Sequence, residues 1–283
     1  MLSSAWPAPA KLNLFLHITG RRDDGYHLLQ TVFQFIQLQD EIDFKILDED
    51  EVTRSSDMSG VAVEDDLVVK AARKLKEKTG CQLGVDINVK KNIPEGGGLG
   101  GGSSDAATTL VALNELWQTG LSVEELSEIG LVLGADIPIF VHAYAAWAEG
   151  VGENLTPIEP VESWYLVIHP SCSVATAKIF NAEELTRNTP AITIRDFLEG
   201  GGRNDCEDVV RNHYKEVAKA LDWLGEFAPV KLTGTGACLF APFADEEKAL
   251  AVKAQLPTEW QGYVVKGMNK SPLLERLATE QSR

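Results

Sequence analysis

The feature that most constrains this chain is a glycine-rich loop that runs directly into a helical pattern. Six of the seven positions 96–102 are glycine, and the seventh is Leu99. Glycine permits positive φ and lets the backbone approach a ligand with no Cβ in the way. Consecutive N–H groups in such a loop, followed by the N-terminus of a helix, form a seat for phosphate. The loop therefore predicts phosphate binding.

Three interpretations of this loop compete. A flexible linker is disfavoured, because linkers seldom hold one leucine between glycine triplets or end on a helix. A dinucleotide fingerprint fits the spacing of Gly96, Gly98 and Gly101. However, Pro94 interrupts the strand-to-helix turn, and no acidic residue ends a following strand at the required distance. The tail of a P-loop is also missing. We therefore interpret the loop as a nucleotide phosphate site of another class.

The residues after the loop have a helical period. Apolar residues recur between Ala106 and Trp117 with a spacing near 3.6, which predicts a helix over 106–117. Oxygen-bearing side chains that can cap this helix precede it at 103–105, and Gly120 stands just beyond its predicted end. The expected order is thus loop, capping residues, helix.

Composition limits the classes of partner. The chain has 283 residues, 44% of them hydrophobic, which is enough for a large core and suggests about two domains. Its formal net charge is -16. A field of that sign argues against a nucleic-acid partner and against an anionic membrane surface. An anionic substrate would need local positive groups or aimed backbone dipoles.

Cysteine usage and the N-terminus point to a cytoplasmic protein. Four scattered cysteines form no CxxC pair, and we interpret Cys81, Cys172, Cys206 and Cys238 as reduced thiols. The N-terminus lacks the basic start of a signal peptide. No apolar run reaches transmembrane length without charges.

The remaining elements alternate loosely between strand and helix, which indicates an α+β protein. Period-2 patterns predict strands over 6–19, 28–38, 42–47, 83–89, 139–147, 164–169, 230–232, 239–242 and 262–266. Helical patterns predict further helices over 66–78, 122–133, 176–180, 208–227 and 246–255. A hairpin turn is expected at 21–25, a loop or short strand edge at 48–60, and a domain boundary within 150–160.

Two charged residues outside the loop are candidates for chemistry. Lys11 and Asn13 are two apart in a strand, so their side chains lie on the same face. Asp136 follows a helix end and precedes Pro138, where it is either the oxygen of an Asx turn or a general base. Phosphoryl transfer needs the donor phosphates held in line, positive charge, and a group for the acceptor proton. The loop, Lys11 and Asp136 would supply these in turn.

Other residues have two open interpretations. The turn of Thr233, Gly234, Thr235 and Gly236 is either a plain β-turn or a second loop that closes around the phosphates. Tyr26 and His27 either pack against the hairpin or bind a ligand, and Phe180 alone is typical of a core residue. A divalent metal on the phosphates is expected chemically, but the sequence shows no dedicated ligand cluster.

Taken together, these motifs resemble the GHMP kinase superfamily over essentially the whole chain. Its three motifs match PAPAKLNL at 7–14, PEGGGLGGGSS at 94–104 and LTGTGA at 232–237. RDDGYH at 22–27 and LGADIP at 133–138 resemble one branch, which phosphorylates a cytidine-diphosphate-linked methylerythritol in non-mevalonate isoprenoid biosynthesis. The resemblance implies two domains, a ribosomal-protein-S5-domain-2-like one over 1–157 that binds ATP and a ferredoxin-like one over 158–283. The active site would lie in the cleft between them.

The resemblance also implies residue roles. Asp136 would receive or orient the proton of the acceptor's 2-hydroxyl, beside Lys11 and the transferring phosphate. Tyr26 and Phe180 would sandwich the cytosine, with His27 on the base edge, while Asn13 and Thr176 hold the acceptor. ATP, as its magnesium complex, would be bound by Pro94, Glu95, Gly96, Gly97, Gly98, Leu99, Gly100, Gly101, Gly102, Ser103 and Ser104.

One position departs from the family pattern. EDDL at 64–67 places Asp66 where the family usually has Asn before Leu. An ionised Asp cannot donate a hydrogen bond, so any contact of Asp66 with adenine must differ here. Lys91, beside the loop, is a second candidate neighbour of adenine.

Two alternatives to this function remain open at this point. One is another small-alcohol kinase of the superfamily, of the mevalonate or homoserine type. The other is a nucleotide sensor without catalysis, against which the presence of both Lys11 and Asp136 argues. The oligomeric state, monomer or homodimer, does not follow from the sequence.

Overall fold

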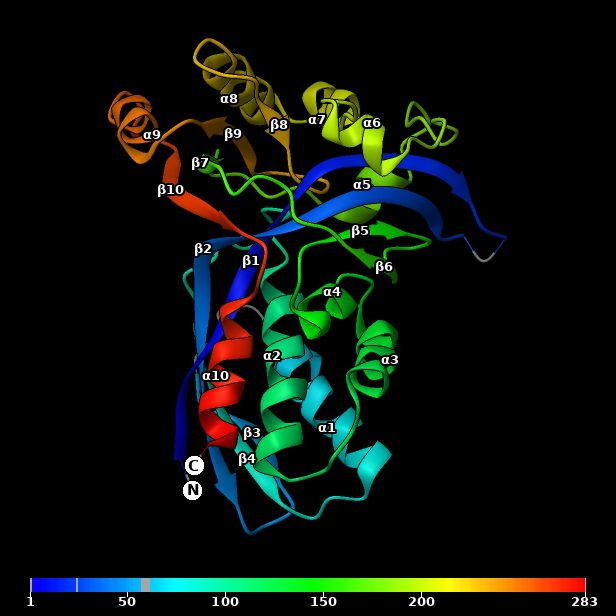
Figure 1. Cartoon of the computed structure of the whole chain (residues 1–283), viewed down its shortest axis with the longest axis vertical. Coiled ribbons are helices and arrows are strands. Elements are labelled where there is room, and N and C mark those ends of the chain that lie inside the picture. The colour runs from blue at the N-terminus through cyan, green and yellow to red at the C-terminus, as the bar shows by residue number, and fades with distance from the viewer. Residues whose placement is uncertain (1, 24, 57–61, 283) are drawn as a thin grey trace.

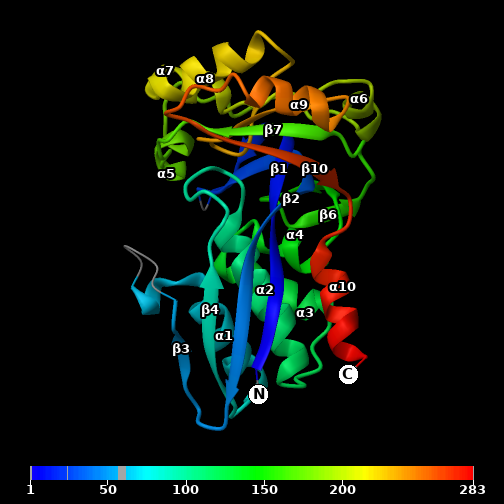
Figure 2. The ribbon, with the colours of Figure 1, turned by 90° about the vertical axis from the view of Figure 1, so that its left-hand side faces the viewer.

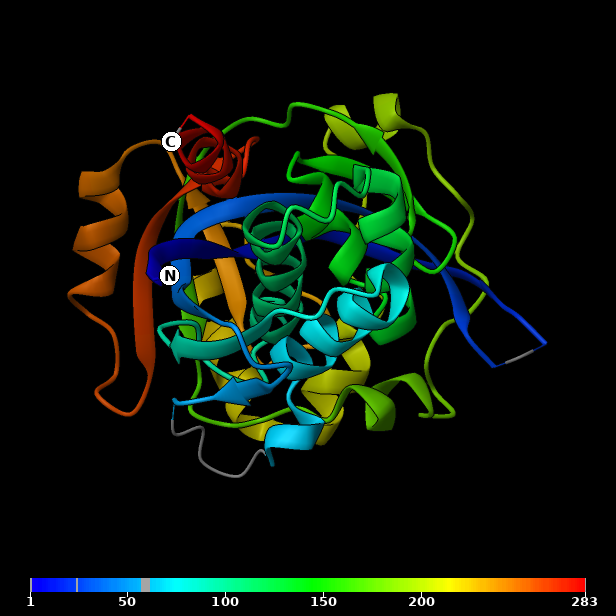
Figure 3. The same cartoon turned by 90° about the horizontal axis from the view of Figure 1, so that it is seen from below.

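Two long antiparallel strands, β1 (Leu2–Arg21) and β2 (His27–Leu47), run from the lower into the upper half of the molecule (Figure 2). The computed structural model describes residues 2–23, 25–56 and 62–282. Asp24 of the expected hairpin turn and residues 57–60 of the expected loop lie outside the described residues. Seen from below, the end of the β1–β2 hairpin projects from the body (Figure 3).

The lower half packs helices on one side of the sheet (Figure 1). Strand β4 (Gly84–Lys90) pairs with β2 in antiparallel orientation, and β3 (Val52–Arg54) pairs with β4 in parallel orientation. β5 (Ala146–Glu149) pairs with β2 and with β6 (Asn154–Pro157). The helices here are η1 (Val63–Asp65), α1 (Leu67–Thr79), α2 (Gly101–Leu116), α3 (Val123–Leu133) and α4 (Ile137–His142).

The upper half continues the same sheet, in the order β3-β4-β2-β10-β7-β9-β8. Its strands are β7 (Trp164–His169), β8 (Lys231–Leu232), β9 (Leu239–Phe243) and β10 (Gln261–Met268). Its helices are α5 (Thr176–Phe180), α6 (Ile194–Leu198), α7 (Glu207–His213), α8 (Lys215–Gly225) and α9 (Glu246–Lys253). After β10, helix α10 (Pro272–Gln281) returns to the lower half and ends near the N-terminus (Figure 1).

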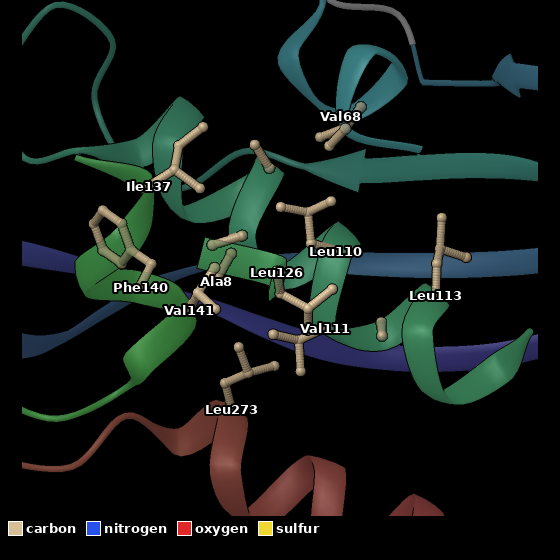
Figure 4. Close-up of a cluster of buried hydrophobic side chains, with 14 of the residues drawn as sticks. Ala8, Val68, Leu110, Val111, Leu113, Leu126, Ile137, Phe140, Val141 and Leu273 are labelled. Atoms are coloured by element: carbon tan, nitrogen blue, oxygen red, sulfur yellow. The ribbon is translucent and has the colours of Figure 1, made fainter. Parts of the chain in front are cut away.

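A buried apolar cluster fixes the helices of the lower half. Figure 4 shows Leu110 of α2, Leu126 of α3, Phe140 of α4 and Leu273 of α10 converging on one another. A second cluster fills the upper half, and β1 contributes to it through Ile18 while Ala8 belongs to the first. Since one strand serves both cores, the division between residues 157 and 158 stays a prediction.

Most expected elements are confirmed, and the exceptions have physical reasons. The predicted strands 28–38 and 42–47 are one strand, β2, because Asp40 between them does not turn the chain. Its buried carboxylate accepts from the backbone N–H groups of Asn92 and Ile93 and from Lys91, which satisfies it inside the sheet.

The other corrections concern the helices. α2 begins at Gly101, inside the glycine loop, so residues 103–105 lie within its first turns instead of capping it. Its N-cap is Gly100 in the left-handed region, which only glycine adopts easily. The predicted strand 139–147 is α4 followed by β5, and the predicted helix 208–227 is broken at Tyr214 into α7 and α8. β6, α6 and α10 were not predicted.

Candidate active site

Two pockets are lined in part by the glycine loop. The larger, of about 690 Å³, is lined by Lys11, Asn13, Tyr26, His27, Asp136, Thr176, Phe180, Gly234 and Thr235, among others. The smaller, of about 360 Å³, is lined by Asp66, Lys91 and the loop from Pro94 to Ser103. Gly98, Gly100 and Ser103 line both pockets, so the loop forms their common wall. Of the predicted site residues, Ser104, Thr233 and Gly236 line neither of the two pockets.

The loop owes its shape to alternating left-handed glycines. Gly96, Gly98 and Gly100 have φ of +66°, +74° and +76°. A Cβ on Gly98 would lie 2.3 Å from the carbonyl oxygen of Thr233, and one on Gly100 would lie 2.7 Å from the Phe140 ring. These two positions leave no space for a side chain, so the bare backbone is what faces the pockets.

Leu99 anchors the loop to the protein. Its side chain is buried, and its carbonyl accepts from the backbone N–H of Lys11 at 2.9 Å. The isolated leucine between glycine triplets is therefore a fixed point that a linker would not need.

The second glycine turn supports the first. Ala237 and Cys238 donate their N–H groups to the carbonyls of Gly96 and Gly97, both at 3.0 Å. The Thr233 hydroxyl also reaches the Gly98 carbonyl, at 3.3 Å. A hydrogen bond from Gly236 N–H to Thr233 O makes this segment a β-turn, while closure of this turn around phosphates stays a prediction.

Lys11 and Asp136 form an ion pair in the larger pocket, and Lys11 is hydrogen-bonded to Gly98, which lines both pockets. Lys11 is 2% exposed, and its Nζ lies 3.3 Å from Asp136 Oδ2. The same ammonium donates to Asn13 Oδ1 at 2.6 Å and to Gly98 O at 3.0 Å. Asp136 occupies the N-cap position of α4 but makes no side-chain cap bond. Its carboxylate is thus held beside a fixed positive charge while 39% of its side chain stays exposed.

A group of aromatic side chains, Tyr26, His27 and Phe180, also lines the larger pocket. The ring of His27 stacks on Phe180 with centroids 5.0 Å apart, and the Nε of Arg187 donates to His27 Nε2 at 3.1 Å. Burial lowers the pKa of His27, as do the positive charges of Arg187 and Arg21. Tyr26 is 61% exposed at the hairpin end. Sequence reasoning gave no signal for Arg187, which lies in an irregular segment after α5.

A buried charge cluster lies behind the smaller pocket. Lys91 Nζ donates to Asp40 and, at 2.7 Å, to Asp105 in the second turn of α2. Burial raises the pKa of Asp105 to about 7, although the Lys91 ammonium acts against it. The cluster ties β2, the segment before the loop and α2 together.

Asp66 has a structural role that explains why its carboxylate is tolerated. One oxygen accepts from the N–H of Val68 at 3.0 Å and caps α1, and the other accepts from the guanidinium of Arg54. Both side chains are nearly buried. An Asn could keep the cap but would lose the charge that Arg54 binds.

We therefore expect Asp66→Asn to lower the free energy of unfolding by about 1–3 kcal/mol, as for a hydrogen bond to a charged group. Urea denaturation followed by circular dichroism measures the change. Asp65→Asn is the matched control, because Asp65 pairs with Lys70 at the surface, and exposed pairs contribute at most about 1 kcal/mol. Equal losses in the two variants would contradict this role for Asp66.

The described residues lack two kinds of structural feature. They hold no helix of sufficient length and apolarity for a membrane span. They also hold no cluster of three or more His, Cys, Asp or Glu side chains arranged for a metal ion.

Comparison with known families gives two matches. The model of the N-terminal domain of GHMP kinases matches residues 66–144, and that of the C-terminal domain matches residues 182–262. The two matches cover more than half of the chain and include the glycine loop and Asp136.

Curated relatives match nearly full length. A protein of Shewanella pealeana named 4-diphosphocytidyl-2-C-methyl-D-erythritol kinase is 55% identical over 278 residues, 98% of each chain. One of the same name from Alkalilimnicola ehrlichii is 56% identical over 279 residues, covering 99% of this chain and 96% of its own.

Solved structures agree with this. A 4-(cytidine 5'-diphospho)-2C-methyl-D-erythritol kinase has a TM-score of 0.81 at 28% identity, covering 94% of this chain and 99% of its own. A homoserine kinase from Cytophaga hutchinsonii has a TM-score of 0.69 at 17% identity, covering 95% and 96%, and shows the likeness of fold alone.

Proposed function

Since the chain belongs to the GHMP kinase family, in the branch of the 4-diphosphocytidyl-2-C-methyl-D-erythritol kinases, we propose how its two pockets divide the reaction. The chain is an ATP-dependent kinase of the non-mevalonate isoprenoid pathway, and it phosphorylates the 2-hydroxyl of the cytidine-diphosphate-linked methylerythritol. The larger pocket takes this acceptor and the smaller one takes ATP. The observation that supports this division is the ion pair of Lys11 with Asp136 in the larger pocket, hydrogen-bonded to Gly98 of the loop that lines both pockets.

The glycine loop fits the ATP phosphates. Gly98 and Gly100 have no room for a side chain, so no side chain covers the N–H groups there. Helix α2 begins within the loop, and its N-terminus adds the positive end of the helix dipole. Residues 94–104 would hold the phosphates, and Lys91 and Asp66 would border the adenine side. Magnesium would enter on the phosphates themselves, where it neutralises charge that develops during transfer.

Two side chains of this protein, Asp136 and Lys11, take part directly in the transfer. Asp136 accepts the proton of the acceptor hydroxyl, whose oxygen then attacks the terminal phosphorus while the bond to the bridging oxygen of ADP breaks. Lys11 stabilises the negative charge on the transferring group, and its bonds to Asn13 and Gly98 O keep it from rotating away. The acceptor would be held by Asn13 and Thr176. The phosphates would be enclosed by the turn of Thr233, Gly234, Thr235 and Gly236.

The alternative acceptors have weaker support. Mevalonate and homoserine kinases match at 16–17% identity, which indicates the fold only. A panel of ATP with the cytidyl substrate, mevalonate and homoserine, read by ADP release, tests the assignment. Turnover of the cytidyl substrate alone is expected, and the absence of any turnover would favour a nucleotide sensor.

A pair of substitutions tests the acceptor end of the pocket. Tyr26→Ala and His27→Ala should each raise KM for the cytidyl substrate by about tenfold or more. Stacking of Tyr26 on the base is worth about 1–3 kcal/mol, and a specific hydrogen-bonding contact of His27 with the base edge about as much. The KM for ATP should stay unchanged, since neither residue borders the smaller pocket. Initial-rate kinetics with each substrate varied in turn give both values, and a rise in KM for ATP alone would reverse the assignment of the pockets.

Three further proposals concern the setting of this reaction. The net charge of -16 supports small-molecule partners over nucleic acid, and free cysteines fit the cytoplasm. The division into domains at 157 and 158 falls between the two family matches. Either a monomer or a homodimer is compatible with a site built from one chain.

A further inference from the structure

Arg187 makes an unusual set of contacts for a residue in an irregular segment. Besides its bond to His27 Nε2, the guanidinium donates to three backbone carbonyls, those of Phe180 at 2.9 Å, Ala182 at 2.6 Å and Leu185 at 3.1 Å. Two of these carbonyls lie at the end of α5 or just beyond it, where a helix leaves acceptors unsatisfied. Arg187 therefore joins α5 to the turn end of the β1–β2 hairpin.

These contacts determine which His27 nitrogen carries the proton. A guanidinium has N–H donors and no acceptor, so the His27 Nε2 that faces it must accept with its lone pair. In neutral imidazole the other nitrogen, Nδ1, then carries the hydrogen. Within the described part of the chain, the His27 ring makes no further hydrogen bond, so Nδ1–H is left for a ligand in the larger pocket.

We propose that Arg187 is a positioning residue that fixes His27 as a hydrogen-bond donor at Nδ1 and thereby selects cytosine over uracil in the acceptor. The proposal rests on the proposed function, in which His27 meets the edge of the base. Cytosine presents a bare acceptor at N3, whereas uracil presents an N–H there. A fixed N–H donor forms a hydrogen bond with N3 of cytosine but is repelled by the N–H of uracil at the same position. A site that places two donors opposite each other discriminates strongly against the wrong base.

The same guanidinium positions the second aromatic residue. By holding the Phe180 carbonyl, Arg187 fixes the backbone beneath the ring on which His27 stacks. A base bound here would contact the Phe180 ring through its face and the His27 Nδ1–H through its edge, and Arg187 holds both residues in place. Loss of Arg187 should therefore make the Phe180 ring more mobile and also allow His27 to adopt either tautomer.

The charges around His27 add a dependence on pH. The ring is flanked by Arg187 and Arg21, and both of these charges, together with burial, lower its pKa. Protonation would place a hydrogen on Nε2 opposite the Arg187 donor, so the neutral ring is the one this geometry accepts. Removing Arg187 should raise the pKa of His27, and the acid limb of kcat/KM for the cytidyl substrate should move to higher pH.

Arg187→Met is the direct test. We expect KM for the cytidyl substrate to rise about tenfold or more and the preference over the uridine analogue to fall about tenfold, which is the size of one lost base contact. The kcat and the KM for ATP should stay within about twofold. Arg195→Met is the matched control, because Arg195 is exposed on α6 and pairs only with Glu199 among the described residues. Arg187→Lys should restore part of the preference, since it keeps a donor and a charge but not the fork.

A spectroscopic measurement keeps the proposal testable even if Arg187→Met folds poorly. The ¹⁵N shifts of His27 in the unaltered protein should show Nδ1 protonated and Nε2 bare at neutral pH. In Arg187→Met the two tautomers should mix. Finding Nε2 protonated in the unaltered protein would overturn the proposal.

His27→Ala separates this inference from the proposed function. If His27→Ala raises KM for the cytidyl substrate but Arg187→Met leaves both KM and base preference unchanged, the inference fails while the function stands. If His27→Ala changes nothing, the assignment of His27 to the base fails first.

Discussion

Asp136→Asn should lower kcat by about 10²–10⁴-fold, the loss that follows removal of a general base. This corresponds to about 3–5 kcal/mol of barrier. The amide keeps the shape of the carboxylate but cannot accept the hydroxyl proton at neutral pH. Because Lys11 keeps its bonds to Asn13 Oδ1 and Gly98 O, the pocket should hold its form. Both KM values are therefore expected to change little.

The measurement is steady-state ADP release with saturating ATP and cytidyl substrate. Asp245→Asn is a suitable control, since Asp245 caps α9 at the surface and Asn caps about as well. It should keep full activity. If Asp136→Asn keeps kcat within threefold of the unaltered enzyme, Asp136 takes no proton in the rate-limiting step and the mechanism proposed for it is wrong.

The sequence predicted the parts of the site better than their assembly. The glycine pattern predicted the loop, and strand alternation predicted that Lys11 and Asn13 share one face. The structure shows a hydrogen bond between these two side chains. That Asp136 lies beside Lys11 did not follow from spacing, because the pairing depends on how α4 packs into the core. Only the resemblance to a family suggested it.

Two of the misjudged elements have the same cause, which is that a polar residue in a local pattern indicates the surface or a helix end. The predicted gap between strands 28–38 and 42–47 contains Asp40, yet this residue is buried and hydrogen-bonded to Lys91 and to two backbone N–H groups. Residues 103–105 read as caps, yet α2 starts earlier because Gly100 adopts the left-handed region. Arg187 carried no signal, since its partners are backbone carbonyls and a histidine far along the chain. Buried polar contacts between distant segments are tertiary facts that local patterns do not contain.

Gly98→Ala is expected to have the second large effect, because two penalties coincide at this residue. Its φ of +74° is strained for any residue with a Cβ. That Cβ would also lie 2.3 Å from the Thr233 carbonyl and 3.1 Å from that of Gly236, and backbone atoms cannot rotate aside. The loop must shift, and with it the N–H groups offered to ATP. A displacement of about 1 Å in a catalytic array costs about 10²-fold, so kcat/KM for ATP should fall by about that factor.

Two control glycines separate strain from collision. Gly80 and Gly120 have φ of +70° and +68°, and a Cβ on either would meet nothing within 4 Å. Alanine there should cost about 1–2 kcal/mol of stability from strain alone and leave the kinetics unchanged. Thermal unfolding and initial rates, measured on all three variants, distinguish the two effects. Should Gly98→Ala lose stability like the controls but keep its kcat/KM for ATP, the bare backbone of the loop would not be what binds the phosphates.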